Sequence, residues 1–87
     1  MLSEIEYKKL AWHSRRGMLE LDLLLEPFVR ERLQCLDTAE QQLYRQLLTH
    51  EDQDLYSWLV ERTIPAEAEL SRIIRLIRAH AGHPGMV

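Results

Sequence analysis

One short run of the sequence, residues 14–20 (Ser-Arg-Arg-Gly-Met-Leu-Glu), holds the residue types best suited to recognising another molecule. Arg16 offers a planar guanidinium with five donors, which suits a carboxylate or backbone carbonyls, and Glu20 offers acceptors close by. Gly17 lies between them without a side chain, so the backbone of a partner has room to approach. Opposite charges around a bare glycine would form a compact docking site with a built-in orientation. We call Arg16, Gly17 and Glu20 the corner.

The corner also has a purely structural interpretation. If one helix ends near Arg16 and the next begins near Met18, Gly17 supplies the left-handed position that commonly ends a helix. Arg15 and Arg16 then lie at the negative end of the first helix, and Glu20 lies at the positive end of the second. Each charge has the sign that its helix end favours, so the residues alone leave both interpretations open.

Five side chains near the corner are candidates for a surrounding contact patch: Lys9, Trp12, Arg15, Met18 and Asp22. Arginine and tryptophan are enriched among the residues that contribute most to protein–protein affinity. Trp12 has a second interpretation, because it follows Ile5 by seven residues and would share a helical stripe with it. It is therefore predicted either in the patch or in the core.

Residue patterns typical of catalysis are missing from the sequence. The three glycines do not form a phosphate-binding loop, and the four histidines are scattered, which predicts surface residues near helix ends (His13, His50, His80 and His83). Ser14 and Ser57 have no nucleophile motif around them. Cys35 has no second cysteine nearby and is predicted to be a half-buried apolar filler. We therefore expect no catalytic residue, no metal site and no cofactor bound by the chain itself.

The elements that must position these residues are helices. The chain has 87 residues, of which 46% are hydrophobic, with only three glycines and three prolines. This length allows one domain, and this composition favours helices over a series of short strands. We expect an all-α, compact five-helix bundle that occupies residues 1–82 as a single domain, followed by a flexible tail of residues 83–87.

Apolar residues at helical spacing, together with start and stop signals, predict where the five helices lie: 4–16, 18–34, a third that follows Asp37, 53–61, and 65–81 with a stop at Gly82. Asp37 and Glu40 have the spacing of a capping box, and Asp52 is expected to cap the fourth helix. Pro65 suits the first position of the fifth helix. Pro27 predicts a kink or a break in the second.

The charge balance excludes one broad class of function. A formal net charge of -3 makes the chain a poor candidate for sequence-independent binding of nucleic acid, which needs a basic surface, although local charge patches can still exist. A single cysteine fits a reducing compartment, and no stretch approaches the roughly 18 apolar residues of a membrane span. We expect a monomeric, cytoplasmic protein that neither binds nucleic acid nor inserts into a membrane.

Three stretches resemble the succinate dehydrogenase flavinylation factor family: the corner within residues 14–22, Pro27-Phe28, and the run Glu-Asp-Gln-Asp-Leu-Tyr-Ser-Trp-Leu at 51–59. The resemblance extends from about Tyr7 to Ile77. It implies a five-helix assembly factor that binds the flavoprotein subunit of succinate dehydrogenase, and in some bacteria that of fumarate reductase. It further implies that the factor promotes a covalent bond between FAD and a histidine of that subunit. FAD would belong to the partner, and the corner would contact that partner.

Two other functions stay open at this stage. One is a helical regulator of another protein, for example an antitoxin-like partner. The other is an enzyme that itself binds or transfers FAD, although the missing glycine-rich loop and the missing catalytic base argue against it.

Overall fold

The computed structural model describes residues 2–81, and five α-helices make up most of this range. They are α1 (Glu4–His13), α2 (Leu19–Arg32), α3 (Thr38–Leu47), α4 (Asp52–Leu59) and α5 (Leu70–Ala81), and a 3-10 turn, η1 (Leu33–Cys35), follows α2. No strand occurs between residues 2 and 81, and the predicted all-α, five-helix fold is confirmed. The stop predicted at Gly82 and the tail predicted at 83–87 lie outside the described residues.

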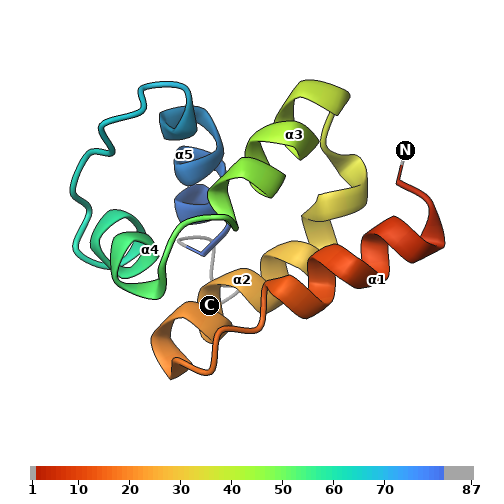
Figure 1. Cartoon of the computed structure of the whole chain (residues 1–87), viewed down its shortest axis with the longest axis horizontal. Coiled ribbons are helices and arrows are strands. Elements are labelled where there is room, and N and C mark those ends of the chain that lie inside the picture. Colours follow the sequence, from red (N-terminus) through yellow and green to blue (C-terminus); the bar gives the residue numbers. More distant parts are fainter. Residues whose placement is uncertain (1, 82–87) are drawn as a thin grey trace.

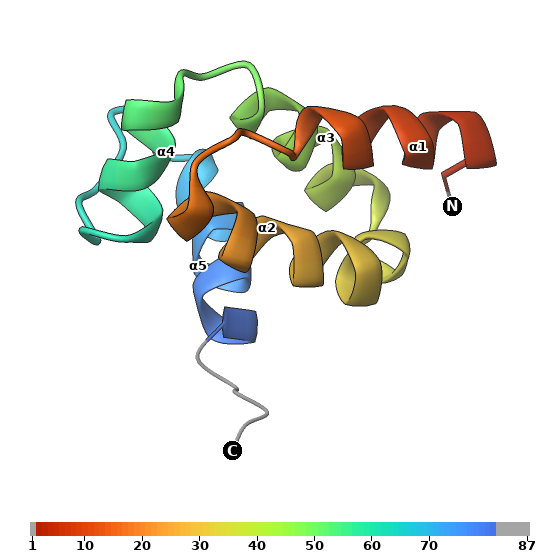
Figure 2. The ribbon, with the colours of Figure 1, turned by 90° about the horizontal axis from the view of Figure 1, so that it is seen from below.

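Helix α5 lies at the centre of the bundle. It contacts α2, α3 and α4, and α1 lies along one outer side of the molecule (Figures 1 and 2). The reason is the spacing of four apolar residues of α5, which repeat at intervals of three and four and are buried: Leu70, Ile73, Ile74 and Ile77. In α1, by contrast, only Leu10 is buried. Most of the hydrophobic stabilisation therefore comes from the four later helices.

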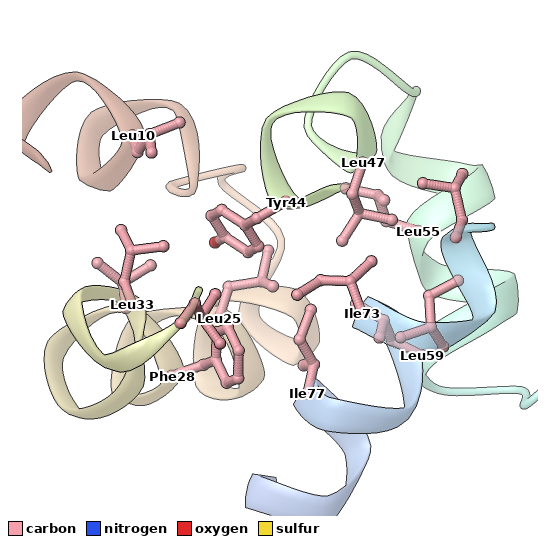
Figure 3. Close-up of a cluster of buried hydrophobic side chains, with 14 of the residues drawn as sticks. Leu10, Leu25, Phe28, Leu33, Tyr44, Leu47, Leu55, Leu59, Ile73 and Ile77 are labelled. Atoms are coloured by element: carbon pink, nitrogen blue, oxygen red, sulfur yellow. The ribbon is translucent and has the colours of Figure 1, made fainter. Parts of the chain in front are cut away.

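The core is formed by side chains from every helix, gathered between α2, α3 and α5 (Figure 3). Its two largest fully buried members are Phe28 and Tyr44, whose rings lie 5.8 Å apart and tilted by 36°. Burying an aliphatic or aromatic side chain of this size contributes about 1.5–3 kcal/mol. Small residues do not fill this core, so removing any of these side chains would leave a cavity.

Helix α1 is shorter than predicted. It ends at His13, and the predicted extension to Arg16 is wrong. The hydroxyl of Ser14 donates to the carbonyl of Leu10, and the backbone N–H of Arg16 donates to the carboxylate of Asp22 instead of continuing the helix. His13, and not the two arginines, therefore occupies the last turn of α1.

Helix α2 continues through Pro27, so the break that was predicted as the alternative to a kink does not occur. The proline deprives the carbonyl of Leu23 of its helical donor, but Leu23 is exposed, so water can reach this part of the helix. The helix then tightens into η1, and the predicted end at residue 34 falls inside that turn.

The capping box predicted at the start of α3 is confirmed. Asp37 accepts from the N–H of Glu40 at 2.7 Å, and Glu40 accepts from the N–H of Asp37 at 3.1 Å. The cap predicted for α4 is wrong, because Glu51 is its N-cap and makes no side-chain capping bond. Asp52 is instead the first residue of the helix, and its carboxylate faces Arg16.

The start predicted for α5 at Pro65 is also wrong. The helix begins at Leu70, so residues 60–69 form a longer connection than predicted. Tertiary contacts hold this connection outside the helix, because Pro65 is buried and Arg78 donates to the carbonyls of Trp58 and Thr63. These contacts outweigh the local preference of proline for a first helical position.

Two predictions about individual side chains need correction. Cys35 is exposed at the end of η1 and is not a half-buried filler. Among the histidines, His13 lies on the surface as predicted, whereas two are half-buried beside carboxylates: His50 with Glu67 (3.0 Å) and His80 with Glu31 (2.9 Å). His83 lies outside the described residues.

A chain of buried hydroxyl groups joins α1 to α3. The Ser14 hydroxyl donates to the carbonyl of Leu10 at 2.7 Å, so the Tyr44 hydroxyl, 2.6 Å away, donates to Ser14. Burial disfavours the charged phenolate and raises the pKa of Tyr44 to about 12, although the hydrogen bond with Ser14 acts in the opposite direction. Tyr44 thus links the peripheral helix to the core through its hydroxyl group.

We expect the unfolding free energy to fall as the pH rises from about 10 to about 12. In this window the unfolded chain releases the Tyr44 proton while the folded chain retains it, which favours unfolding by up to about 1.4 kcal/mol per pH unit. Urea unfolding across this pH range measures the slope. Tyr44→Phe should flatten it and cost about 1 kcal/mol at neutral pH, whereas Tyr56→Phe is the control that keeps the slope. An unchanged slope in Tyr44→Phe would refute this account.

Candidate functional site

The candidate site is centred on the connection between α1 and α2, residues 14–18. Gly17 is exposed there and has a φ of +77°. This is a left-handed backbone conformation, which residues other than glycine adopt only with strain. A Cβ atom placed on Gly17 would meet no atom of the chain within 4 Å. The left-handed conformation predicted for this residue is confirmed, but it occurs beyond the end of α1 and does not cap the helix. Its surface is open to a partner.

Arg16 points into the molecule. Its side chain is only 15% exposed, Nη2 donates to the carbonyl oxygen of Leu48 at 2.5 Å, and Nη1 lies 3.5 Å from Oδ1 of Asp52. Its Nε atom is enclosed and has no hydrogen-bond partner within the described chain. The guanidinium that the sequence offers to a partner is therefore already engaged between the end of α3 and the start of α4.

Asp22 is engaged in the same way. Its Oδ1 accepts from the backbone N–H of Arg16 at 2.9 Å, and its own N–H donates to the carbonyl of Met18 at 2.9 Å. These two bonds close the connection on itself and fix the backbone on both sides of Gly17. Asp22 thus shapes the corner from within, and the sequence pattern alone gave no sign of this bond.

The remaining predicted patch residues differ in exposure. Lys9, Arg15 and Glu20 are exposed, and Met18 is half-buried against the core. Trp12 is 69% exposed, so its alternative placement in the core is wrong. Glu20 lies in the first turn of α2, where a carboxylate is electrostatically favoured, and this part of the structural interpretation is confirmed.

Two exposed leucines belong to this surface and were missed by the sequence analysis. Leu19 is 69% exposed and Leu23 is 64% exposed, and both follow the corner on α2 at a spacing of four residues. The sequence could have predicted their exposure, because Leu19 and Leu23 lie outside the helical stripe that contains the buried Leu21 and Leu25. Exposed apolar side chains that lie near one another are typical of surfaces that contact another molecule.

A groove of about 350 Å³ lies beside the corner, between α1 and α2. Residues from α1 and from its connection to α2 line one wall, and residues of α2 line the other: Tyr7, Ala11, Ser14 and Arg15, facing Asp22, Glu26, Val29 and Arg30. The hydroxyl of Tyr7 donates across the groove to the carbonyl of Val29 at 3.4 Å. Side chains of both charge signs line this groove, which suits a polar protein segment better than a purely apolar ligand.

Residues 2–81 hold neither a metal-ligand cluster nor a membrane-spanning helix. No group of three or more potential ligands is arranged there to hold a metal ion. No helix in this range is long and apolar enough to cross a bilayer. The Ser14 hydroxyl is buried and engaged on both sides, so it is not placed to act as a nucleophile.

Comparison with known proteins gives a consistent family. Residues 8–81 match the family described as "Flavinator of succinate dehydrogenase". The chain is 52% identical over 77 residues to a protein of Pseudomonas aeruginosa named FAD assembly factor SdhE, covering 88% of this chain and 92% of that relative. A relative of the same name from Coxiella burnetii is 45% identical over 71 residues, covering 82% of this chain and 87% of its own length. The chain therefore belongs to the succinate dehydrogenase flavinator family, whose members are non-catalytic assembly factors.

Proposed function

We propose that this chain binds the flavoprotein subunit of succinate dehydrogenase, and that of fumarate reductase, and promotes the covalent attachment of FAD to it. It would act as a monomer in the cytoplasm and would bind no FAD itself. Membership of the flavinator family supports the activity. The observation that supports the docking site is the open left-handed Gly17, flanked by exposed charges and exposed apolar side chains.

The charges around Gly17 would orient the partner. Arg15 and Glu20 are exposed on either side of it and carry opposite signs. A partner surface with the reverse arrangement would be attracted in one orientation and repelled in the other. The open space over Gly17 lets a partner backbone come close enough to use both charges at once.

The exposed apolar side chains would supply most of the affinity. Covering Trp12, Leu19 and Leu23 removes large apolar surfaces from water, each worth roughly 1–2 kcal/mol. Exposed ion pairs contribute about 0–1 kcal/mol each, so the charges alone could not hold the complex together. Affinity and orientation therefore come from different residues of one surface.

The bond to FAD would form within the flavoprotein, using the partner's own histidine. The factor can favour that reaction only by binding the competent arrangement of the partner more tightly than the others. Moving a two-state equilibrium from 1:99 to 99:1 requires about 10⁴-fold tighter binding to the favoured state. Such a difference calls for an extended surface, and the corner, the two leucines and the groove together offer one.

Gly17→Arg should abolish flavinylation of the partner, because the long side chain would fill the open space over the corner. The assay incubates the apo flavoprotein subunit with FAD, with and without this protein, and measures covalent flavin by in-gel fluorescence. Gly17→Ala is the matched control, since it has a similar backbone cost of about 1 kcal/mol but adds only one methyl group.

The two variants separate obstruction from backbone strain. We expect similar melting temperatures for both, with flavinylation largely retained by Gly17→Ala and lost by Gly17→Arg. Full flavinylation by Gly17→Arg would exclude the corner as the docking site. Equal loss in both variants would point to a conformational effect.

Replacing an exposed apolar side chain on this surface should weaken binding without unfolding the protein. Trp12→Ser and Leu23→Ser should each raise the Kd for the flavoprotein subunit about tenfold, since each removes roughly 1–2 kcal/mol of apolar burial. Ile64→Ser is the matched control, because Ile64 is 85% exposed but lies in the 60–69 connection. A titration calorimeter measures all three, and an equal loss of affinity in Ile64→Ser would contradict the assignment.

A further inference from the structure

Arg16 joins two parts of the chain that are more than thirty residues apart. Its side chain reaches from the α1–α2 connection to Leu48 and Asp52, which lie on either side of the α3–α4 connection. Leu48 is the C-cap of α3 and Asp52 is the first residue of α4. The guanidinium therefore meets the negative end of one helix dipole, and Asp52 lies at the positive end of the next.

These contacts leave the guanidinium little capacity for a partner. With 15% of the side chain exposed and its two Nη atoms engaged, a carboxylate from outside would have to displace Asp52 or the carbonyl of Leu48. Such a displacement is unfavourable, because an arginine moved outward would leave the carbonyl of Leu48 and the carboxylate of Asp52 without their donor. The side chain of Asp52 is 42% exposed and forms an ion pair with Arg16.

The same contacts fix the residue that precedes Gly17. The backbone N–H of Arg16 is held by Asp22, and its side chain is held by Asp52 and Leu48. Gly17 has few steric limits of its own, since it lacks a side chain and a Cβ atom placed on it would meet no atom within 4 Å. Its left-handed conformation therefore depends on how firmly Arg16 is anchored.

We propose that Asp52 and Arg16 are positioning residues for flavoprotein docking. Asp52 fixes the side chain of Arg16, and Arg16 in turn fixes the backbone that precedes Gly17. The partner binds the resulting backbone shape without contacting either side chain. This inference rests on the proposed function, and it assigns Arg16 an internal task in place of the direct contact expected from the sequence.

A double-mutant cycle tests the proposal. The Kd of the flavoprotein subunit is measured for the wild type, Arg16→Gln, Asp52→Asn and the double variant, at a temperature where melting curves show all four folded. We expect Asp52→Asn to weaken binding about tenfold, Arg16→Gln at least as much, and the double variant no more than Arg16→Gln alone. Independent contacts with the partner would instead multiply the two losses, and that result would overturn the proposal.

A second pair of variants, Glu20→Ala and Asp52→Asn, serves as the control for this cycle. Glu20→Ala removes an exposed corner carboxylate that has no hydrogen bond or ion pair within residues 2–81. When Glu20→Ala is combined with Asp52→Asn, the fold-increase in Kd should be the product of the two single increases, because a contact residue and a positioning residue act separately. Non-multiplying losses in this pair as well would mean that any two weakening changes saturate the assay, and the proposal would lose its support.

Amide NMR of the free protein gives a readout that needs no partner. Asp52→Asn should shift the amide signals of residues 15–18 while leaving those of Ile73 and Ile77 in place. Unchanged signals at 15–18 would overturn the positioning role even if binding is weakened. If the wild-type protein neither binds the flavoprotein subunit nor raises its covalent flavin, the proposed function itself fails, and the NMR result still decides whether Asp52 holds the corner.

Discussion

Burial of one face of α5 is the constraint on which the rest of the structure depends. Its four buried residues must be covered at once, and α2, α3 and α4 are arranged around it to do so. A helix of 12 residues is not stable alone in water, so α5 forms only because this face is buried. The long 60–69 connection follows from the same requirement, since the chain must travel from the end of α4 back to the start of α5. Arg78 holds that connection through the carbonyls of Trp58 and Thr63.

The proposed docking surface lies where this constraint is weakest. Helix α1 contributes one buried residue, and polar contacts do much of the work of attaching it and the connection that follows. The Tyr44–Ser14 bond and the buried Arg16 hold that connection on the side that faces the core. Its outer side is therefore not needed for these contacts. The proposed docking surface is therefore held in place by internal contacts and yet exposes large apolar side chains. Such a combination suits a factor that must favour one arrangement of its partner.

Predictions from the sequence succeeded where local chemistry is decisive. The capping box of Asp37 and Glu40, the buried stripe of α5 and the left-handed Gly17 were all predictable, because each depends on residues a few positions apart. They failed for the helix end at Arg16, the cap at Asp52 and the helix start at Pro65, because contacts with residues distant in the sequence outweigh the local preferences there. Trp12 shows the same limit, because a seven-residue spacing from Ile5 predicts a shared stripe but not which side of the helix is buried.

By itself the sequence determined the five helices, the family and the position of the corner, because helical periodicity, capping and a distinctive motif are all local properties. Only the tertiary structure decided which corner residues face outward. Gly17 and Glu20 are open to solvent, whereas Arg16 is drawn inward by Leu48 and Asp52. The physical reason is that an arginine can satisfy its donors equally well within its own chain or on a partner. The choice depends on acceptors that folding brings together from opposite ends of two other helices.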